Sequence, residues 1–106
     1  MTNISDREKA FEDKYHHDEE LQFKTEARRN KLLGLWAADL MGLTGDAANE
    51  YAKTVVKADL IEPGEEDVKQ KVLKDFQSRN VDKSEHQLER TMAELMVEAK
   101  KQMMTE

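Results

Sequence analysis

The residue types most able to do chemistry in this sequence are a histidine pair, runs of acidic residues and one tryptophan near several cations. His16 and His17 precede Asp18, but adjacent side chains on a helix point about 100° apart, and no third or fourth metal ligand follows at a useful spacing. Acid pairs such as Glu65 and Glu66 stand in charge runs, where carboxylates are ordinarily solvated. The chain has no Cys, which removes thiolate ligands and nucleophiles. We therefore expect neither a metal site nor an enzyme active site.

Trp36 and the cations before it form a second candidate. Arg28, Arg29 and Lys31 precede the only Trp of the chain, and an indole beside guanidinium groups would stack on a base and neutralise phosphates. This arrangement would suit a purine nucleotide such as ADP or ATP. Trp36 also lies in the most apolar stretch, residues 32–38, where packing in the core is the simpler role. Weak nucleotide binding at Arg28, Arg29 and Trp36 is kept as an alternative, and no other cofactor is expected.

A third candidate lies near the start of the chain. Ile4, Phe11 and Tyr15 stand at offsets of seven and eleven residues, which places them on one narrow face of a helix among charged residues. Such a face suits a groove on a partner protein. Each anchor, once buried, would contribute about 1.5–3 kcal/mol. The spacing alone leaves a second interpretation open, in which these residues fold back on the rest of the protein.

Charges are sorted along the same part of the chain. Asp6–Glu20 holds seven acidic and three basic residues, whereas Lys24–Lys31 holds four basic residues and one acidic residue. A partner with complementary patches would use this polarity to set register and approach rate. The same order, acids first and bases last, also matches the dipole of a solvated helix, so the pattern does not decide between the two.

The elements that carry these residues are predicted to be helices. Ser5 and Glu8 form a capping box, so a first helix is expected from Asp6, and no clear stop precedes the turn at 43–45. Gly34 lies inside this helix and weakens it by about 1 kcal/mol relative to Ala. A break there is a secondary alternative.

Three shorter helices are expected after it. The second begins near Asp46 and ends before Pro63, the third follows the acidic residues 65–67 and stops at Asn80, and the fourth starts at a second capping box of Ser84 with Gln87. Apolar residues recur at helical spacing in each: Ala48, Tyr51, Val55 and Ala58; Val68, Val72 and Phe76; Leu88, Met92, Leu95, Ala99 and Met103.

Helix lengths predict the domain organisation. Residues 6–43 would span about 57 Å as one helix, whereas helices of roughly 14–20 residues span about 20–30 Å, so only the C-terminal half of the first helix fits in a bundle. The core is expected to begin near Leu32. The predicted fold is all-α: a four-helix bundle with a long first helix whose N-terminal part projects or is disordered. Residues 1–20 would be a mobile partner-binding segment and 21–106 the globular domain.

Composition excludes several classes of protein. A chain of 106 residues with net charge −6 and 38% charged residues suits one small domain, and the acidic balance argues against a nucleic-acid module. The longest apolar run has seven residues, against about 20 for a membrane-spanning helix. The first ten residues hold no apolar secretory core. We expect a cytosolic protein that does not insert in a membrane.

Two long stretches of the sequence resemble a known family. DREKAFEDKYHHDEELQFKTEARRNKLLGLWAA (6–38) and LTGDAANEYAKTVVKADL (43–60) are similar to the zeta-type inhibitor subunit of bacterial F-type ATP synthases. The similarity continues, less sharply, through EEDVKQKVLKDF and the final helix. The resemblance implies a four-helix protein whose mobile N-terminal segment enters a catalytic interface of the ATPase head. There it would stop ATP hydrolysis and spare synthesis.

The resemblance also implies residues and partners. Met1–Glu20 would be the inhibitory portion, with Ile4, Phe11 and Tyr15 as apolar anchors. Its charged contacts would be Arg7, Lys9 and Lys14. The partner would be the ATPase head with its alpha, beta and gamma subunits, and the protein would be a monomer when free, peripheral to the membrane through the ATP synthase. The alternative function is that of a small helical nucleotide-binding regulatory module.

Overall fold

The computed structural model describes residues 18–61 and 64–105. These residues form four α-helices and no strand: α2 (Glu19–Leu40), α3 (Gly45–Ile61), α4 (Glu65–Ser78) and α5 (Glu85–Thr105). The all-α, four-helix fold expected from the sequence is therefore confirmed over this part of the chain. The N-terminal part that was expected to project or to be disordered lies outside the described residues.

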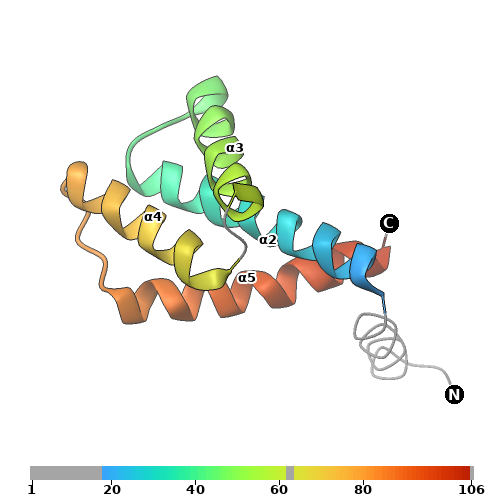
Figure 1. The fold of residues 1–106 in the computed structure, drawn as a ribbon. Helices are drawn as coiled ribbons and strands as arrows, with labels where there is room; N and C mark the ends of the chain where they lie inside the picture. Colours follow the sequence, from blue (N-terminus) through green and yellow to red (C-terminus); the bar gives the residue numbers. More distant parts are fainter. Residues whose placement is uncertain (1–17, 62–63, 106) are drawn as a thin grey trace, which may run out of the picture.

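The four helices pack around α2. α2 and α5 run side by side in opposite directions, so the last turns of α5 lie near the first turns of α2 (Figure 1). α3 crosses α2, and α4 packs against α2, α3 and α5. None of the helices in the described residues is both long and apolar enough to cross a membrane.

The start of α2 differs from the sequence prediction. Asp18 has extended backbone angles (φ −122°, ψ 100°), and its carboxylate accepts the Leu21 N–H at 3.0 Å. This N-cap ends any continuous helix running from Asp6 into α2, so the prediction of one unbroken helix is wrong at this residue. Asp is favoured at an N-cap because its side chain satisfies a free backbone donor, and Glu19 and Glu20 in the first turn suit the helix dipole.

The helix that lies in the bundle is close to the C-terminal half of the predicted first helix, as the comparison of helix lengths predicted. α2 has 22 residues and α5 has 21, so both span about 30 Å and α5 accompanies α2 along most of its length. Arg28, in the third turn of α2, donates to Gln102 near the end of α5 at 2.9 Å. The N-terminal half of α2 is therefore part of the bundle.

The apolar core lies around the C-terminal half of α2. Its buried members match the periodic positions of the sequence; they are Leu33, Ala37, Val55, Val68, Val72, Phe76, Leu88 and Met92. Trp36 is half-buried and packs edge-on against Phe76, with ring centroids 5.8 Å apart. Both the start of the core near Leu32 and the packing role of Trp36 are confirmed.

The ends of the later helices follow their local sequence. Ser84 Oγ accepts the Gln87 N–H at 3.1 Å, and Gln87 Oε1 accepts the Ser84 N–H at 2.9 Å, so the predicted capping box is confirmed. Asn80 has a left-handed backbone (φ 58°) just after α4, as expected for a helix stop. Asp46 is wrong as a cap: it lies in the first turn of α3, where its charge suits the helix dipole.

Gly34 marks the point where α2 and α3 cross. A Cβ placed on it would lie 2.5 Å from the Cα of Ala52, closer than atoms approach in proteins. The absence of a side chain thus allows the two backbones to touch. The expected weakness of α2 at Gly34 is offset by this close packing, and α2 does not break there.

Candidate functional site

The six residues predicted to bind a partner lie outside the described residues; they are Ile4, Arg7, Lys9, Phe11, Lys14 and Tyr15. His16 and His17 lie there too. Their roles stay predictions. The described residues next to them are Asp18 and the first turns of α2, so the candidate site is built from the surfaces that this helix shares with its neighbours.

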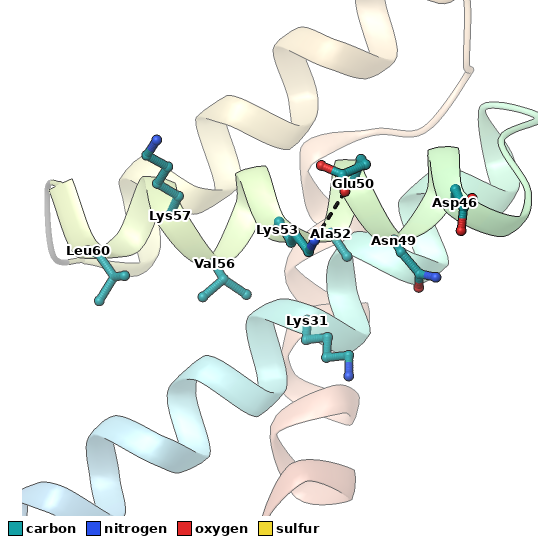
Figure 2. Close-up of a pocket in the computed structure, with 9 residues that line it drawn as sticks. All are labelled: Lys31, Asp46, Asn49, Glu50, Ala52, Lys53, Val56, Lys57 and Leu60. Carbon is teal, nitrogen blue, oxygen red and sulfur yellow. Dashed lines mark hydrogen bonds and ion pairs between the residues drawn. The ribbon is translucent and has the colours of Figure 1, made fainter.

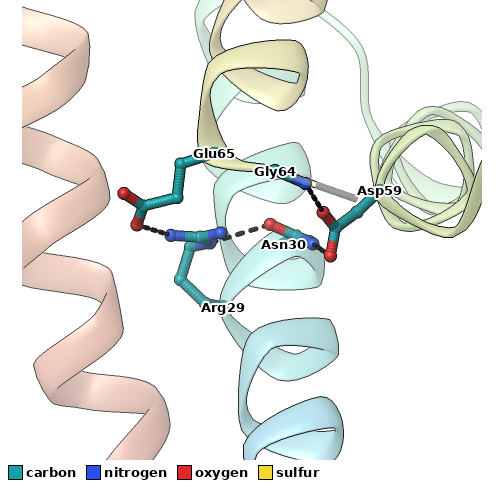
Figure 3. Close-up of polar contacts among 5 residues, drawn as sticks. All are labelled: Arg29, Asn30, Asp59, Gly64 and Glu65. Carbon is teal, nitrogen blue, oxygen red and sulfur yellow. Dashed lines mark hydrogen bonds and ion pairs between the residues drawn. The ribbon is translucent and has the colours of Figure 1, made fainter. Parts of the chain in front are cut away.

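A buried polar network joins α2 to the junction of α3 and α4. Arg29 is only 2% exposed, and its guanidinium donates to Asn30 Oδ1 at 2.7 Å and to Glu65 Oε1 at 2.9 Å (Figure 3). Asn30 Nδ2 in turn donates to Asp59 Oδ2 at 3.2 Å, and the other oxygen of Asp59 accepts the Gly64 N–H at 3.1 Å. The network fixes the angle between the first half of α2 and the start of α4.

The burial of Arg29 is a feature that the sequence interpretation missed. The sequence places it beside Arg28 among the cations near Trp36, and its burial was not predicted. A signal was present in the spacing, because Thr25, Arg29 and Leu33 stand four residues apart and so share one helix face. All three are buried. The buried face of α2 is therefore apolar in its C-terminal half and is made of hydrogen-bonded polar residues in its N-terminal half.

Glu26 adjoins this network and is affected by it. Burial raises the pKa of its carboxyl group, Asp59 and Glu65 raise the pKa further, and Arg29 opposes them. The surroundings of Glu26 therefore disfavour its charged form. Three carboxylates, those of Glu26, Asp59 and Glu65, thus surround the buried guanidinium of Arg29.

The three residues predicted to bind a nucleotide contact different neighbours. Arg29 faces Glu65 at the start of α4, Arg28 donates to Gln102 of α5, and Trp36 packs on Phe76 of α4. Adjacent residues on a helix diverge by about 100°, which explains why Arg28 and Arg29 separate. Nucleotide binding at these residues stays a prediction, and this packing does not favour it.

Two ionic clusters hold α4 in place. Lys69 Nζ lies 2.8 Å from a carboxylate oxygen of Glu66 and 2.8 Å from one of Glu85, so it bridges α4 and α5. These hydrogen bonds raise the pKa of Lys69 and lower the pKa of Glu66. These ion pairs stabilise the packing of α4 against α5.

The second cluster joins α3 and α4. The Tyr51 hydroxyl donates to Asp75 Oδ2 at 2.8 Å, and Lys71 contacts the same oxygen at 2.8 Å while lying 5.2 Å from the centre of the Tyr51 ring. Burial, followed by the bond to Asp75, raises the pKa of Tyr51. In the described part of the chain, no three His, Asp or Glu side chains are grouped as metal ligands would be.

A groove opens between α2 and α3, and none of the residues that line it belongs to the polar network. We call it the α2–α3 groove; its volume is about 570 Å³. Figure 2 shows the residues that line it: Lys31, Asp46, Asn49, Glu50, Ala52, Lys53, Val56, Lys57 and Leu60. This surface was not predicted from the sequence. Its signal was a second apolar face on α3, in which Ala52, Val56 and Leu60 recur every four residues.

Comparisons with known proteins identify the family. A family model described as ATPase inhibitor subunit zeta matches residues 1–102, which includes both the described helices and the segment before them. A structure solved by solution NMR is 49% identical, covers 80% of this chain and 96% of that chain, and superposes with a TM-score of 0.71. Among proteins with curated descriptions, none matches. The resemblance found in the sequence is confirmed, and the chain belongs to the ATPase inhibitor subunit zeta family.

Proposed function

We propose that this chain inhibits the F-type ATP synthase by inserting its N-terminal segment, residues 1–20, into a catalytic interface of the ATPase head. The inserted segment would contact the alpha, beta and gamma subunits. It would block the opening of that interface during ATP hydrolysis, and synthesis driven from the membrane side would expel it. The protein would act as a regulatory subunit and not as an enzyme, as a monomer on the cytoplasmic side of the membrane.

The family match over residues 1–102 carries this proposal, because it extends through the segment that would be inserted. A second observation supports it. Ile4, Phe11 and Tyr15 share one narrow face of a helix in the segment that would be inserted. An apolar face among charged residues is suited to a groove on a partner.

The test is ATP hydrolysis by the isolated ATPase head. The double variant Phe11→Ala/Tyr15→Ala removes two rings from the predicted binding face, and each loss would weaken docking by about 2 kcal/mol. We expect inhibition to fall sharply while helix content and melting stay those of the parent. Val97→Ala is the matched control, since Val97 is also apolar and is 54% exposed, on α5.

Two results would contradict the proposal. One is full inhibition by the double variant, which would assign inhibition to the bundle surface. The other is an equal loss of inhibition in Val97→Ala. The charged residues Arg7, Lys9 and Lys14 are expected to contribute less than the rings, because exposed charge pairs contribute at most about 1 kcal/mol each.

A further inference from the structure

The α2–α3 groove has an apolar floor, made by Ala52, Val56 and Leu60, among six polar or charged lining residues, and the described residues leave it uncovered. From the crossing at Gly34 and Ala52 the two helices diverge, and exposure rises along α3 from Ala52 (2%) through half-buried Val56 to Leu60 (54%). Val56 and Leu60 point into the space beside α2 (Figure 2). The residues that line the groove lie on both sides of the crossing: Asp46 and Asn49 precede Ala52 on α3, whereas Val56 and Leu60 follow it, on the side of the N-terminal half of α2.

The apolar surface continues on α2. Phe23 stands 11 residues before Gly34 and Ala27 stands seven before it; spacings of seven and 11 residues return to within about 20° of the same helix face. Both therefore lie on the side of α2 that faces α3. Phe23 is 55% exposed. The surface thus runs from Val56 and Leu60 towards the residue at which α2 begins.

The chain holds a segment of the right length to cover this surface. Seventeen residues precede Asp18 in the sequence, and as a helix they would extend about 25 Å. Lys31, which lines the groove, lies 13 residues into α2 from Asp18, or about 20 Å away. A turn at the Asp18 cap would allow this segment to run back along α2 as far as Lys31.

The segment also has a suitable face. On a helix, Ile4, Phe11 and Tyr15 fall within about 40° of one another, and Glu8 and Glu12 flank them on one side. Lys31 and Lys57, which line the groove, form no ion pair with any described residue. Apolar anchors and one acidic flank would meet an apolar floor and two available lysines.

We propose that residues 1–17 dock into the α2–α3 groove of their own chain, and that this closed form withholds them from the ATPase head. The docking itself rests on the groove and on the sequence of the segment; its regulatory meaning rests on the proposed function. Because the same anchors serve both contacts, apparent inhibitory affinity falls by the fraction of molecules that are closed. A chain that is nine-tenths closed would inhibit about tenfold less strongly than an open one.

A spin label tests the docking in the full chain. The chain has no Cys, so Ala10→Cys accepts a single nitroxide, about 120° around a helix from the anchors. We expect the NMR signals of Val56 and Leu60 to broaden and to recover when the label is reduced. Signals of Val97 on α5 should not change. A label at Asp82→Cys, in the connection between α4 and α5, serves as the control position.

Two adjacent residues of α3 give a matched pair of variants. Leu60 lines the groove, whereas Ile61, 71% exposed, lines a pocket between α3 and α4. Leu60→Ser should abolish the broadening at Val56 and should lower the concentration needed for half-inhibition several-fold. Ile61→Ser should change neither measurement.

The outcomes separate this proposal from the proposed function. Broadening of Val56 and Leu60 no stronger than that of Val97 overturns the docking, whatever the ATPase assay gives. Broadening that appears between labelled and isotope-enriched molecules in a mixture assigns the groove to a second copy and also overturns it. If docking is observed and Leu60→Ser inhibits no better than Ile61→Ser, its regulatory role is overturned. If docking is observed while Phe11→Ala/Tyr15→Ala still inhibits fully, the proposed function fails and the docking stands.

Discussion

The two halves of α2 are held by different kinds of contact. The C-terminal half buries Leu33, Ala37 and Ala38 against the other helices, whereas the N-terminal half buries Thr25, Arg29 and Asn30. The first set is stabilised by removal of apolar surface from water. The second set is held by hydrogen bonds, whose net contribution is about 1 kcal/mol each.

This difference shows how one helix serves both the fold and the proposed interaction. The apolar half anchors the bundle, while the polar half fixes how α2 lies against α3 and α4. Polar contacts are directional, because a hydrogen bond requires defined angles. Hydrogen bonds thus fix the orientation of the N-terminal half of α2, although this half buries few apolar residues.

The largest effect is expected at the apolar end. Phe76→Ala removes a ring that is 1% exposed and that packs against Trp36, so it should lower the free energy of unfolding by about 3–5 kcal/mol. Phe23→Ala, the matched substitution in the polar half of α2, should cost less than about 1 kcal/mol, since Phe23 is 55% exposed. Urea denaturation measures both. Equal losses would contradict the division of α2.

The next effect concerns the polar end. Arg29→Met keeps most of the side-chain volume but leaves the buried Asn30 oxygen without the Arg29 donor, which should cost about 1–3 kcal/mol. Arg28→Met, one residue earlier and half-buried, should cost less than about 1 kcal/mol. Thermal melting of the two variants measures these losses of stability. A larger loss for Arg28→Met would mean that the network does not orient α2.

Gly34→Ala tests the crossing that separates the two halves. Helix propensity alone predicts that this change stabilises α2 by about 1 kcal/mol. The contact with the Ala52 backbone predicts the reverse sign, a loss of about 1–3 kcal/mol from overpacking. The sign of the change in urea denaturation separates the two, and a stabilised variant would show that the helices do not touch there.

The smallest effect is the pH dependence due to Glu26. Its pKa lies above the ordinary value of 4.5, first because of burial and then because of Asp59. The folded state binds this proton more tightly, so the associated stability is present below the ordinary pKa and is lost as pH rises through the raised pKa. Glu26→Gln should therefore stabilise the protein at pH 7, by less than about 1 kcal/mol. The gain should vanish on acidification below 4.5, and a gain that grew there would contradict the assignment.

The sequence predicted the features that depend on local patterns. The capping box of Ser84 and Gln87, the stop at Asn80 and the apolar faces around Phe76 and Leu88 are all encoded within a few residues. Local patterns of this kind report a helix and its buried face directly. They also located the start of the apolar core and, through longer runs of residues, the family.

The features that were missed depend on contacts between helices. Arg29 is identical in type to its half-buried neighbour Arg28, and only the position of Glu65 on α4 explains its burial. Likewise, the sequence alone predicts that Gly34 weakens its helix. Its role is explained only by the close contact with the backbone of Ala52 on α3. The break at Asp18 was missed for another reason: an acidic residue in an acidic run is compatible with both a cap and a helix interior. The candidate groove could not be predicted because it depends on the angle at which α2 and α3 cross, and the sequence of one helix does not determine that angle.

The central claim is that the N-terminal segment, and not the bundle, enters the ATPase head. Photo-crosslinking tests it most directly: a benzoylphenylalanine replaces Phe11 in one chain and Val97 in another, and each is irradiated with the head during ATP hydrolysis. We predict crosslinks from position 11 to the alpha or beta subunit and none from position 97. Crosslinks from position 97 alone would contradict the account.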